Sequence, residues 1–337
     1  VYDREALLPG DLFNGPAIII EANATTVVEP GWQTETTALG HLVLTRVEAR
    51  EARHAAGTHA DPVMLEIFNN LFMSIAEQMG ATLANTSFSV NIKERLDFSC
   101  AVFDADGGLI ANAPHMPVHL GSMGESIQVV IRENRGTMKP GDVYALNAPY
   151  NGGTHLPDLT FFKPIFWEGK VVAFACVKGH WLDVGGNVPG SMDPFATEIY
   201  QEGLRIPTSK LYAEGVPSEA VFDLIATNVR LPIQVRGDMR SQLAACEIGE
   251  RALLALIDRY GAAELNRHCE ALLDYSELRA RQEISALPDG KYEFEDYIDA
   301  DNIKEGPLKI VVSLEIAGDE ITVDLEGSSP QVPAGIN

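Results

Sequence analysis

Apolar runs separated by glycine-containing turns predict two β-hairpins in the middle of the chain. Residues 159–162 and 171–177 are largely apolar and flank Trp167-Glu-Gly-Lys170, a pattern typical of two buried strands joined by a tight turn. Residues 96–103 and 108–111 flank Asp104-Ala-Asp-Gly107, whose residues tolerate left-handed backbone geometry. Because a hairpin returns the chain to its starting end, we expect the turns on either side of residues 159–177 to lie side by side.

Apolar positions spaced three and four residues apart predict helices around these hairpins. Asp61-Pro62 is typical of a helix start, and a helix of about twenty residues is expected to follow it. Ser122-Met-Gly-Glu125 has the spacing of a capping box, and Gly136 stands where that helix is expected to end. Further helices are expected at residues 218–229, 231–260 and 262–286, and further strands at residues 292–298, 308–316 and 320–325.

The same pattern divides the chain into a small first part and a large second part. Residues 1–47 contain short strand-like runs, and this segment is too short to hold a large core alone. Residues 48–60 lack any period and are typical of a linker, so residues 61–337 form the predicted main domain. Because strands and helices are partly segregated, we predict an α+β fold: antiparallel β-hairpins and sheets packed with long helices, after a small β N-terminal segment.

Composition and charge argue against two classes of partner. The 337 residues include 25 Lys plus Arg and 48 Asp plus Glu, a formal net charge of −23, so we expect no nucleic-acid surface. No apolar run reaches the roughly 20 residues of a membrane span and no signal pattern is visible, so we expect no membrane insertion and a cytoplasmic location. The cysteines form no CxxC pair and are expected to be reduced thiols: Cys100, Cys176, Cys246 and Cys269.

Two His-x-x-Asp units stand in glycine-rich turns at the ends of the central apolar runs. They are His155 with Asp158, and His180 with Asp183. Two imidazoles and one carboxylate that leave coordination positions open are typical of a catalytic divalent metal site. The two units therefore offer two imidazoles and two carboxylates from which one divalent metal site could be built. The alternative is that each pair forms a local hydrogen bond that fixes a turn.

Other polar residues are candidates for proton transfer or substrate binding. His115 and His119 could act as general acid or base, because histidine titrates near physiological pH, or could simply pack in their loop. Glu94 and Arg95, next to Asp97, could clamp a carboxylate or form a surface ion pair. Six polar residues surround the start of the helix expected at residues 231–260, where they could bind an anion or be solvated and charge-paired: Asn228, Arg230, Arg236, Asp238, Arg240 and Gln242. The predicted catalytic residues are His115, His119 and Asp183, and the predicted substrate contacts are Glu94, Arg95, Arg205 and Asp238.

Six stretches resemble the hydantoinase B and 5-oxoprolinase family, which is related to the alpha subunits of acetone and acetophenone carboxylases. These stretches are 94–99, 115–123, 152–158, 179–186, 205–207 and 237–242. Residues 1–47 are similar to the C-terminal end of hydantoinase A-type regions, through Gly15-Pro-Ala-Ile and Thr25-Thr-Val-Val-Glu-Pro-Gly-Trp32. An A-type end that runs into a B-type start resembles the single-chain layout of 5-oxoprolinases.

This resemblance implies ATP-dependent opening of a cyclic amide such as 5-oxoproline or a hydantoin. It implies a divalent metal, manganese first with zinc or iron as alternatives, on His155, Asp158 and His180, with Asp183 as a fourth ligand or as an acceptor that orients a histidine. Trp181 stands where many relatives have a second histidine. ATP is expected to bind a hydantoinase A-like ATPase domain or subunit outside this chain, because no phosphate-loop spacing is present. We also expect a C-terminally truncated B-type domain and a homo-oligomer. Two alternatives stay open: a component of a ketone carboxylase and a non-catalytic assembly module.

Overall fold

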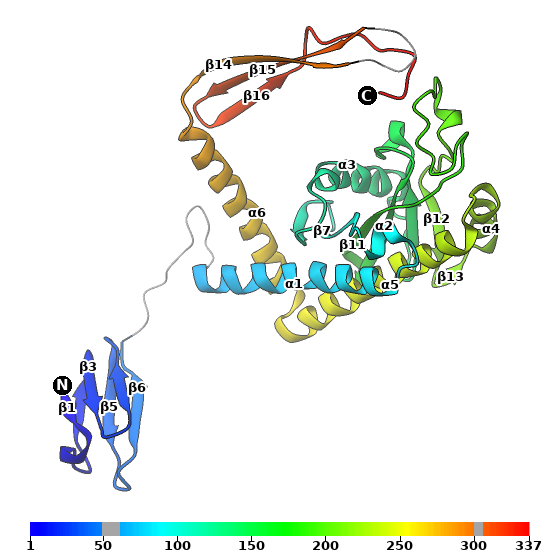
Figure 1. The fold of residues 1–337 in the computed structure, drawn as a ribbon. Helices are drawn as coiled ribbons and strands as arrows, with labels where there is room; N and C mark the ends of the chain where they lie inside the picture. The colour runs from blue at the N-terminus through cyan, green and yellow to red at the C-terminus, as the bar shows by residue number, and fades with distance from the viewer. Residues whose placement is uncertain (49–60, 300–305, 337) are drawn as a thin grey trace. The chain divides into compact units, whose positions relative to one another are not determined.

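The computed structural model describes residues 1–48, 61–299 and 306–336 (Figure 1). The chain divides into two compact units, Val1–His54 and Ala55–Asn337. The predicted linker, residues 48–60, lies outside the described residues except for its first position. No helix in the described ranges is both long enough and apolar enough to cross a membrane.

The first unit consists of two three-stranded sheets. Its strands are β1 (Tyr2–Asp3), β2 (Leu12–Asn14), β3 (Ala17–Ile20), β4 (Thr25–Val28), β5 (Trp32–Thr36) and β6 (Leu42–Arg46). They form the sheets β1-β3-β4 and β2-β5-β6. Only Ala17, Ile19 and Val28 form its buried apolar centre, as expected for so short a segment.

The second unit is built on a seven-stranded sheet with the order β13-β12-β9-β10-β11-β7-β8. Its strands are β7 (Phe98–Asp104), β8 (Leu109–Asn112), β9 (Val143–Leu146), β10 (Asp158–Trp167), β11 (Lys170–His180), β12 (Ser209–Ala213) and β13 (Val216–Pro217). All neighbouring strands pair antiparallel, and both predicted hairpins, β7–β8 and β10–β11, are present. The predicted α+β class is confirmed.

Six α-helices accompany this sheet among the described residues: α1 (Pro62–Thr86), α2 (Val90–Lys93), α3 (Pro117–Asn134), α4 (Glu219–Asn228), α5 (Pro232–Tyr260) and α6 (Ala262–Ser285). The Asp61 carboxylate accepts hydrogen bonds from the backbone amides of Val63 and Met64, so it caps α1 as predicted. The predicted start of α3 at Ser122 is wrong. This helix already begins at Pro117, whose fixed φ suits a first helical position, and Ser122 lies inside it.

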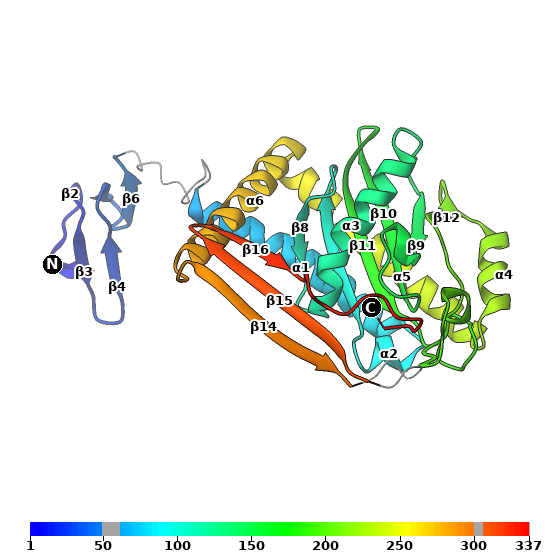
Figure 2. The ribbon, with the colours of Figure 1, turned by 90° about the horizontal axis from the view of Figure 1, so that it is seen from above.

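The sheet is buried on both faces, which makes the second unit three-layered. Alternate residues of β7 enter different cores: Cys100 and Val102 pack with α1 and α5, whereas Ala101 and Phe103 pack with α3. The same division holds along β10 and β11. Figure 2 shows α3 on one side of these strands and α1 with α5 on the other. Continuous apolar runs, rather than alternating ones, are therefore what these strands require.

Three further strands follow α6 and form a separate antiparallel sheet. They are β14 (Gly290–Ile298), β15 (Leu308–Ala317) and β16 (Glu320–Asp324), close to the predicted positions. An ion pair of 3.2 Å joins Arg281 Nη1 on α6 to Asp319 Oδ2 in the turn between β15 and β16.

Candidate metal centre

The register of the central hairpin brings two polar side chains together at one edge of the sheet. Asp158 is the first residue of β10, His180 is the last residue of β11, and the two are direct partners in the ladder. Glu168 and Gly169 both have positive φ in the tight turn that fixes this pairing. Since partners in a ladder share a face, both side chains lie on the face that α3 covers.

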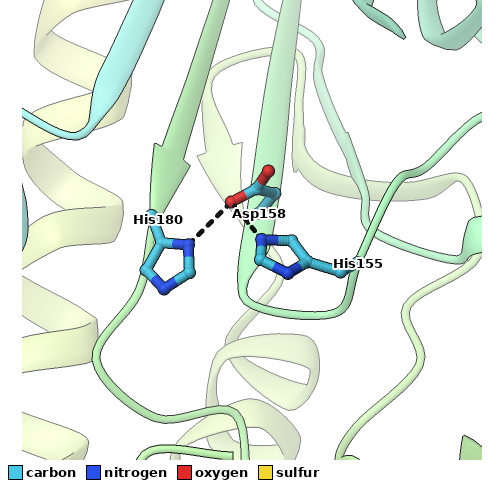
Figure 3. A group of neighbouring side chains, drawn as sticks. All are labelled: His155, Asp158 and His180. Atoms are coloured by element: carbon cyan, nitrogen blue, oxygen red, sulfur yellow. Dashed lines mark hydrogen bonds and ion pairs between the residues drawn. The ribbon is translucent and has the colours of Figure 1, made fainter. Parts of the chain in front are cut away.

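The three predicted ligands converge on one point. His155 Nε2 lies 2.8 Å from Asp158 Oδ1, and His180 Nδ1 lies 2.9 Å from the same oxygen. Figure 3 shows both rings directed at the carboxylate, His180 from a strand end and His155 from the turn before β10. One donor atom from each residue lies within 4.8 Å of the other two. A small shift of the side chains would place all three donors around one cation.

The charges in this cluster favour a cation. Burial alone would raise the pKa of Asp158, but hydrogen bonds and charge interactions with His155, His180 and His119 hold it well below its ordinary value. Burial lowers the pKa of His180, yet its hydrogen bond to Asp158 and the charge of Asp97 raise it overall. The carboxylate is therefore ionised at any physiological pH and attracts positive charge to its open side.

His119 lies beside the cluster without belonging to the three-residue set. Its side chain is buried on α3, with Nε2 3.4 Å from Asp158 Oδ2 and 3.8 Å from Asp97 Oδ1. Its Nδ1 lies 3.1 Å from the Ser99 hydroxyl, which fixes the ring orientation. Burial lowers the pKa of His119 and outweighs the opposing effect of Asp158, so the ring is neutral near pH 7 and able to accept a proton.

A buried lysine behind the carboxylate was not anticipated. Lys178 is fully buried, and its Nζ donates to Ser122 Oγ at 2.7 Å and to Thr154 Oγ1 at 3.4 Å. Thr154 Oγ1 in turn lies 3.3 Å from Asp158 Oδ2. Burial lowers the pKa of Lys178, and the charge of Asp158 partly opposes that effect. The period of two along β11 places Lys178 on the same face as His180, and that signal in the sequence could have revealed it.

Two predicted catalytic residues lie elsewhere. His115 packs on Phe98 with a centroid separation of 4.6 Å, and its Nδ1 lies 3.3 Å from the Cys100 amide nitrogen, so it is held against α1 and β7. Asp183 is buried and accepts hydrogen bonds from three backbone amides and from Arg230 Nη1 at 3.0 Å. With both oxygens occupied in this way, Asp183 neither reaches the cluster nor orients a histidine, contrary to the expectation from its His-x-x-Asp spacing.

The predicted substrate contacts also separate. Glu94 and Arg95 are exposed, and neither lines the cavity of about 720 Å³ into which the cluster opens. Asp238 is buried, and its Oδ1 accepts from the amides of Phe88 and Ser89 at 2.8 and 3.1 Å, so it fixes the start of α2 instead of binding substrate. Arg205 lines a second cavity.

The expected anion site around the start of α5 is largely occupied by internal contacts. Arg230 binds Asp183, and Arg236 forms an ion pair with Asp223. Gln242 is fully buried: its Oε1 accepts from Trp181 Nε1 at 2.9 Å, and its Nε2 donates to the Leu159 carbonyl at 2.9 Å. This side chain thus fixes α5 against both strands that carry the cluster. Nothing in the sequence distinguished it from a solvated glutamine.

The cluster opens into a cavity of about 720 Å³. His119, His155, Asp158 and His180 line its polar side, together with Asp97, which is partly exposed. Its lining also includes Val118, Pro149, Tyr150 and Ile199. A cavity of this size with a few convergent polar groups fits a small molecule next to the cation site.

A family model described as hydantoinase B/oxoprolinase matches residues 61–337. The chain belongs to the hydantoinase B/oxoprolinase family. Among its curated relatives, 5-oxoprolinase 1 of Arabidopsis thaliana is 37% identical over 98% of this chain and 28% of that protein. The B-type component of a putative D-/L-hydantoinase from a Pseudomonas species is 35% identical over 81% of this chain and 48% of that protein. The chain therefore spans about a quarter to a half of the length of these relatives.

Two solved structures have a similar architecture. The ATP-dependent caprolactamase of Pseudomonas jessenii aligns with a TM-score of 0.77 and 35% identity, over 82% of this chain and 47% of that one. A nucleotide-free acetone carboxylase aligns with a TM-score of 0.74 at 18% identity, over 80% of this chain and 37% of that one, which shows a shared fold. The assignment of residues 1–47 to an A-type region stays a prediction.

Proposed function

We propose that this chain is the metal-holding part of an ATP-dependent cyclic amidohydrolase of the 5-oxoprolinase or hydantoinase type. The observation that carries the proposal is the convergence of His155, Asp158 and His180 within 4.8 Å at the wall of a cavity large enough for a five-membered ring. The names of the relatives give the reaction class: 5-oxoprolinase, D-/L-hydantoinase and ATP-dependent caprolactamase.

The donor set suits a divalent cation of the first transition row. Two imidazole nitrogens and one carboxylate oxygen match the preferences of manganese, iron and zinc, and we propose manganese first. The open cavity side leaves room for a reactant beside the ion. When bound, such an ion would polarise a carbonyl or phosphoryl oxygen, or lower the pKa of a water molecule.

The residues around the ligands would orient the reactant and carry protons. His119 lines the cavity, with its Nε2 near the carboxylates of Asp97 and Asp158, and we propose that it accepts a proton from an attacking water and returns it to the amide nitrogen that leaves. The Ser99 hydroxyl fixes the ring through Nδ1. A resonance-stabilised amide needs prior activation by ATP, which we assign to a hydantoinase A-like ATPase domain or subunit.

The decisive experiment is titration of the chain with Mn²⁺. We expect wild-type protein to bind one ion by calorimetry, and the variants His155→Ala, Asp158→Asn and His180→Ala to lose that binding while they keep the fold by circular dichroism. His41→Ala is the matched control, because His41 is an exposed histidine in the first unit. Failure of wild-type protein to bind Mn²⁺, Fe²⁺ or Zn²⁺ would overturn the proposal and favour the non-catalytic assembly module.

Hydrolase and carboxylase chemistry are separated by a second measurement. With the ATPase partner present, turnover of 5-oxoproline or a hydantoin that consumes ATP without bicarbonate supports the hydrolase. If the chain instead forms product from a ketone only when bicarbonate is present, the carboxylase is identified. The fold shared with acetone carboxylase is the reason to test this alternative.

A further inference from the structure

A second cavity adjoins the metal cavity. Its volume is about 510 Å³, and it shares Pro149 and Tyr150 with the lining of the metal cavity. Tyr150 and Tyr200 are both largely exposed there, so two aromatic rings face a space next to the cluster. A molecule that reaches from one cavity into the other would pass the shared residues.

Arg205 is the basic residue of this second cavity. Its guanidinium carbon lies 4.3 Å from the centre of the Tyr200 ring, so the planar group is stacked on an aromatic face. Arg205 forms no ion pair with any residue in the described ranges, although the chain has 48 acidic residues for 25 basic ones. Its hydrogen-bond donors are therefore available to an external anion.

The backbone on both sides of Arg205 is fixed to the metal-binding turn. Asn147 is fully buried, and its Oδ1 accepts from the Ile206 amide at 2.6 Å. Its Nδ2 donates to the Leu204 carbonyl at 3.0 Å and to the Leu156 carbonyl at 2.7 Å, next to His155. A single buried amide side chain thus sets the position of the arginine segment relative to a ligand of the cluster. Such support is typical of a site built to a defined geometry.

We propose that Arg205 and Tyr200 form an oxyanion subsite that holds the anionic group of the reactant while its amide lies at the metal centre. The subsite rests on the proposed function for the identity of that reactant. A carboxylate on the cyclic amide and a phosphoryl group delivered from ATP share the chemistry that a stacked arginine recognises, two oxygens in the plane of the guanidinium fork. Stacking on Tyr200 holds the fork in place before the anion arrives, which lowers the entropy cost of binding.

The test compares three probes on the purified chain by calorimetry or ligand-observed NMR. They are 5-oxoproline, 2-pyrrolidinone, which has the same ring without the carboxylate, and inorganic phosphate. For Arg205→Gln we expect binding of the recognised anion to weaken about tenfold or more, with 2-pyrrolidinone unaffected. A loss confined to 5-oxoproline identifies the substrate carboxylate as the occupant, and a loss for phosphate identifies a phosphoryl group. Arg205→Lys should restore binding only in part, because an ammonium lacks the fork.

Arg259→Gln is the matched control. Arg259 also stacks on a tyrosine, with its guanidinium carbon 5.0 Å from the Tyr260 ring, but it lines neither cavity. The inference is overturned if Arg205→Gln binds both anions as wild-type protein does, or if wild-type protein binds neither anion at millimolar concentration. Mn²⁺ affinity, measured in the same samples, should be unchanged in Arg205→Gln. If wild-type protein binds an anion but no metal, and Arg205→Gln loses the anion binding, the proposed function fails while the subsite stands.

Discussion

At the scale of single residues, environment decides what each aspartate of the two His-x-x-Asp units does. Asp158 receives two imidazoles on one oxygen and faces a cavity, whereas Asp183 is enclosed by backbone amides and Arg230. Identical spacing in the sequence therefore gives a ligand candidate in one turn and a structural acceptor in the other. The difference comes from position: Asp158 is the first residue of β10, whereas Asp183 lies three residues beyond the end of β11, in a loop that Arg230 contacts.

Asp183→Asn should destabilise the protein without weakening metal binding. The amide would leave the partly exposed Arg230 guanidinium and three backbone donors with poorer acceptors, which costs about 3 kcal/mol in the free energy of unfolding. Urea denaturation measures the change, and Mn²⁺ titration of the folded variant provides the comparison. If Mn²⁺ affinity fell as far as in Asp158→Asn, Asp183 would have to act at the metal centre after all.

Metal affinity should depend on pH through His180. A metal binds the neutral ring, and the pKa of His180 is raised above its ordinary value near 6.5, so a proton competes with the ion below that raised pKa. We expect Mn²⁺ affinity to be constant above this pKa and to fall about tenfold per pH unit below it. Asp97→Asn should move the midpoint to lower pH, because the charge of Asp97 contributes to the raised pKa. A midpoint that does not move in this variant would contradict the assignment.

The candidate ligands could be predicted from the sequence, but their supporting contacts could not. His155, Asp158 and His180 follow from residue types at turns flanking a hairpin, a local signal. The partners of Lys178 and Gln242 depend on which helix covers which face, and those contacts join residues more than 50 positions apart. The role of Asp238 could not be predicted for the same reason: its carboxylate accepts from the amide of Phe88, 150 positions away. Local patterns do not encode such distant pairs.

At the scale of elements, the central hairpin is the part that positions the cluster. Its register pairs Asp158 with His180, and the predicted strand ends lie within a few residues of those observed. The start of α3 was misjudged because Pro117 and a capping-box pattern at Ser122 compete, and the proline prevails. This earlier start adds His119 to the buried face of the helix, where its ring meets the carboxylates of the cluster.

Gln242→Leu should loosen the contact between α5 and the hairpin and weaken metal binding. Leucine matches the size of glutamine but leaves the buried Trp181 N–H and the Leu159 carbonyl without their partner, at a cost of about 2 kcal/mol. Because Trp181 follows His180 directly, we expect Mn²⁺ affinity to fall together with stability. Ser241→Ala is the control, since its hydroxyl bonds only within α5, to the Gly237 carbonyl. If both substitutions lowered stability and Mn²⁺ affinity equally, α5 would support the cluster through packing alone and not through the hydrogen bonds of Gln242.

At the scale of the whole molecule, the order of the seven strands lay beyond the sequence. Neighbours joined by short loops follow from the sequence, but the pairs β12–β9 and β7–β11 join strands that are not consecutive in the chain. The fold class was predictable because it requires only the elements and their partial segregation along the chain. The placement of α1 and α5 on one face and α3 on the other required the three-dimensional structure.

Removal of residues 1–54 should leave metal binding unchanged. The three proposed ligands belong to the second unit, as do His119, Lys178 and Gln242, and the first unit has its own buried centre at Ala17, Ile19 and Val28. A chain that starts at Ala55 keeps Asp61, whose carboxylate caps α1, so the large unit retains its first helix. Calorimetric titration with Mn²⁺ and thermal unfolding of this chain, beside the full chain, measure the two expectations. A weaker Mn²⁺ affinity in the shortened chain would show that the first unit contributes to the metal centre, and would contradict the expectation that the second unit binds metal by itself.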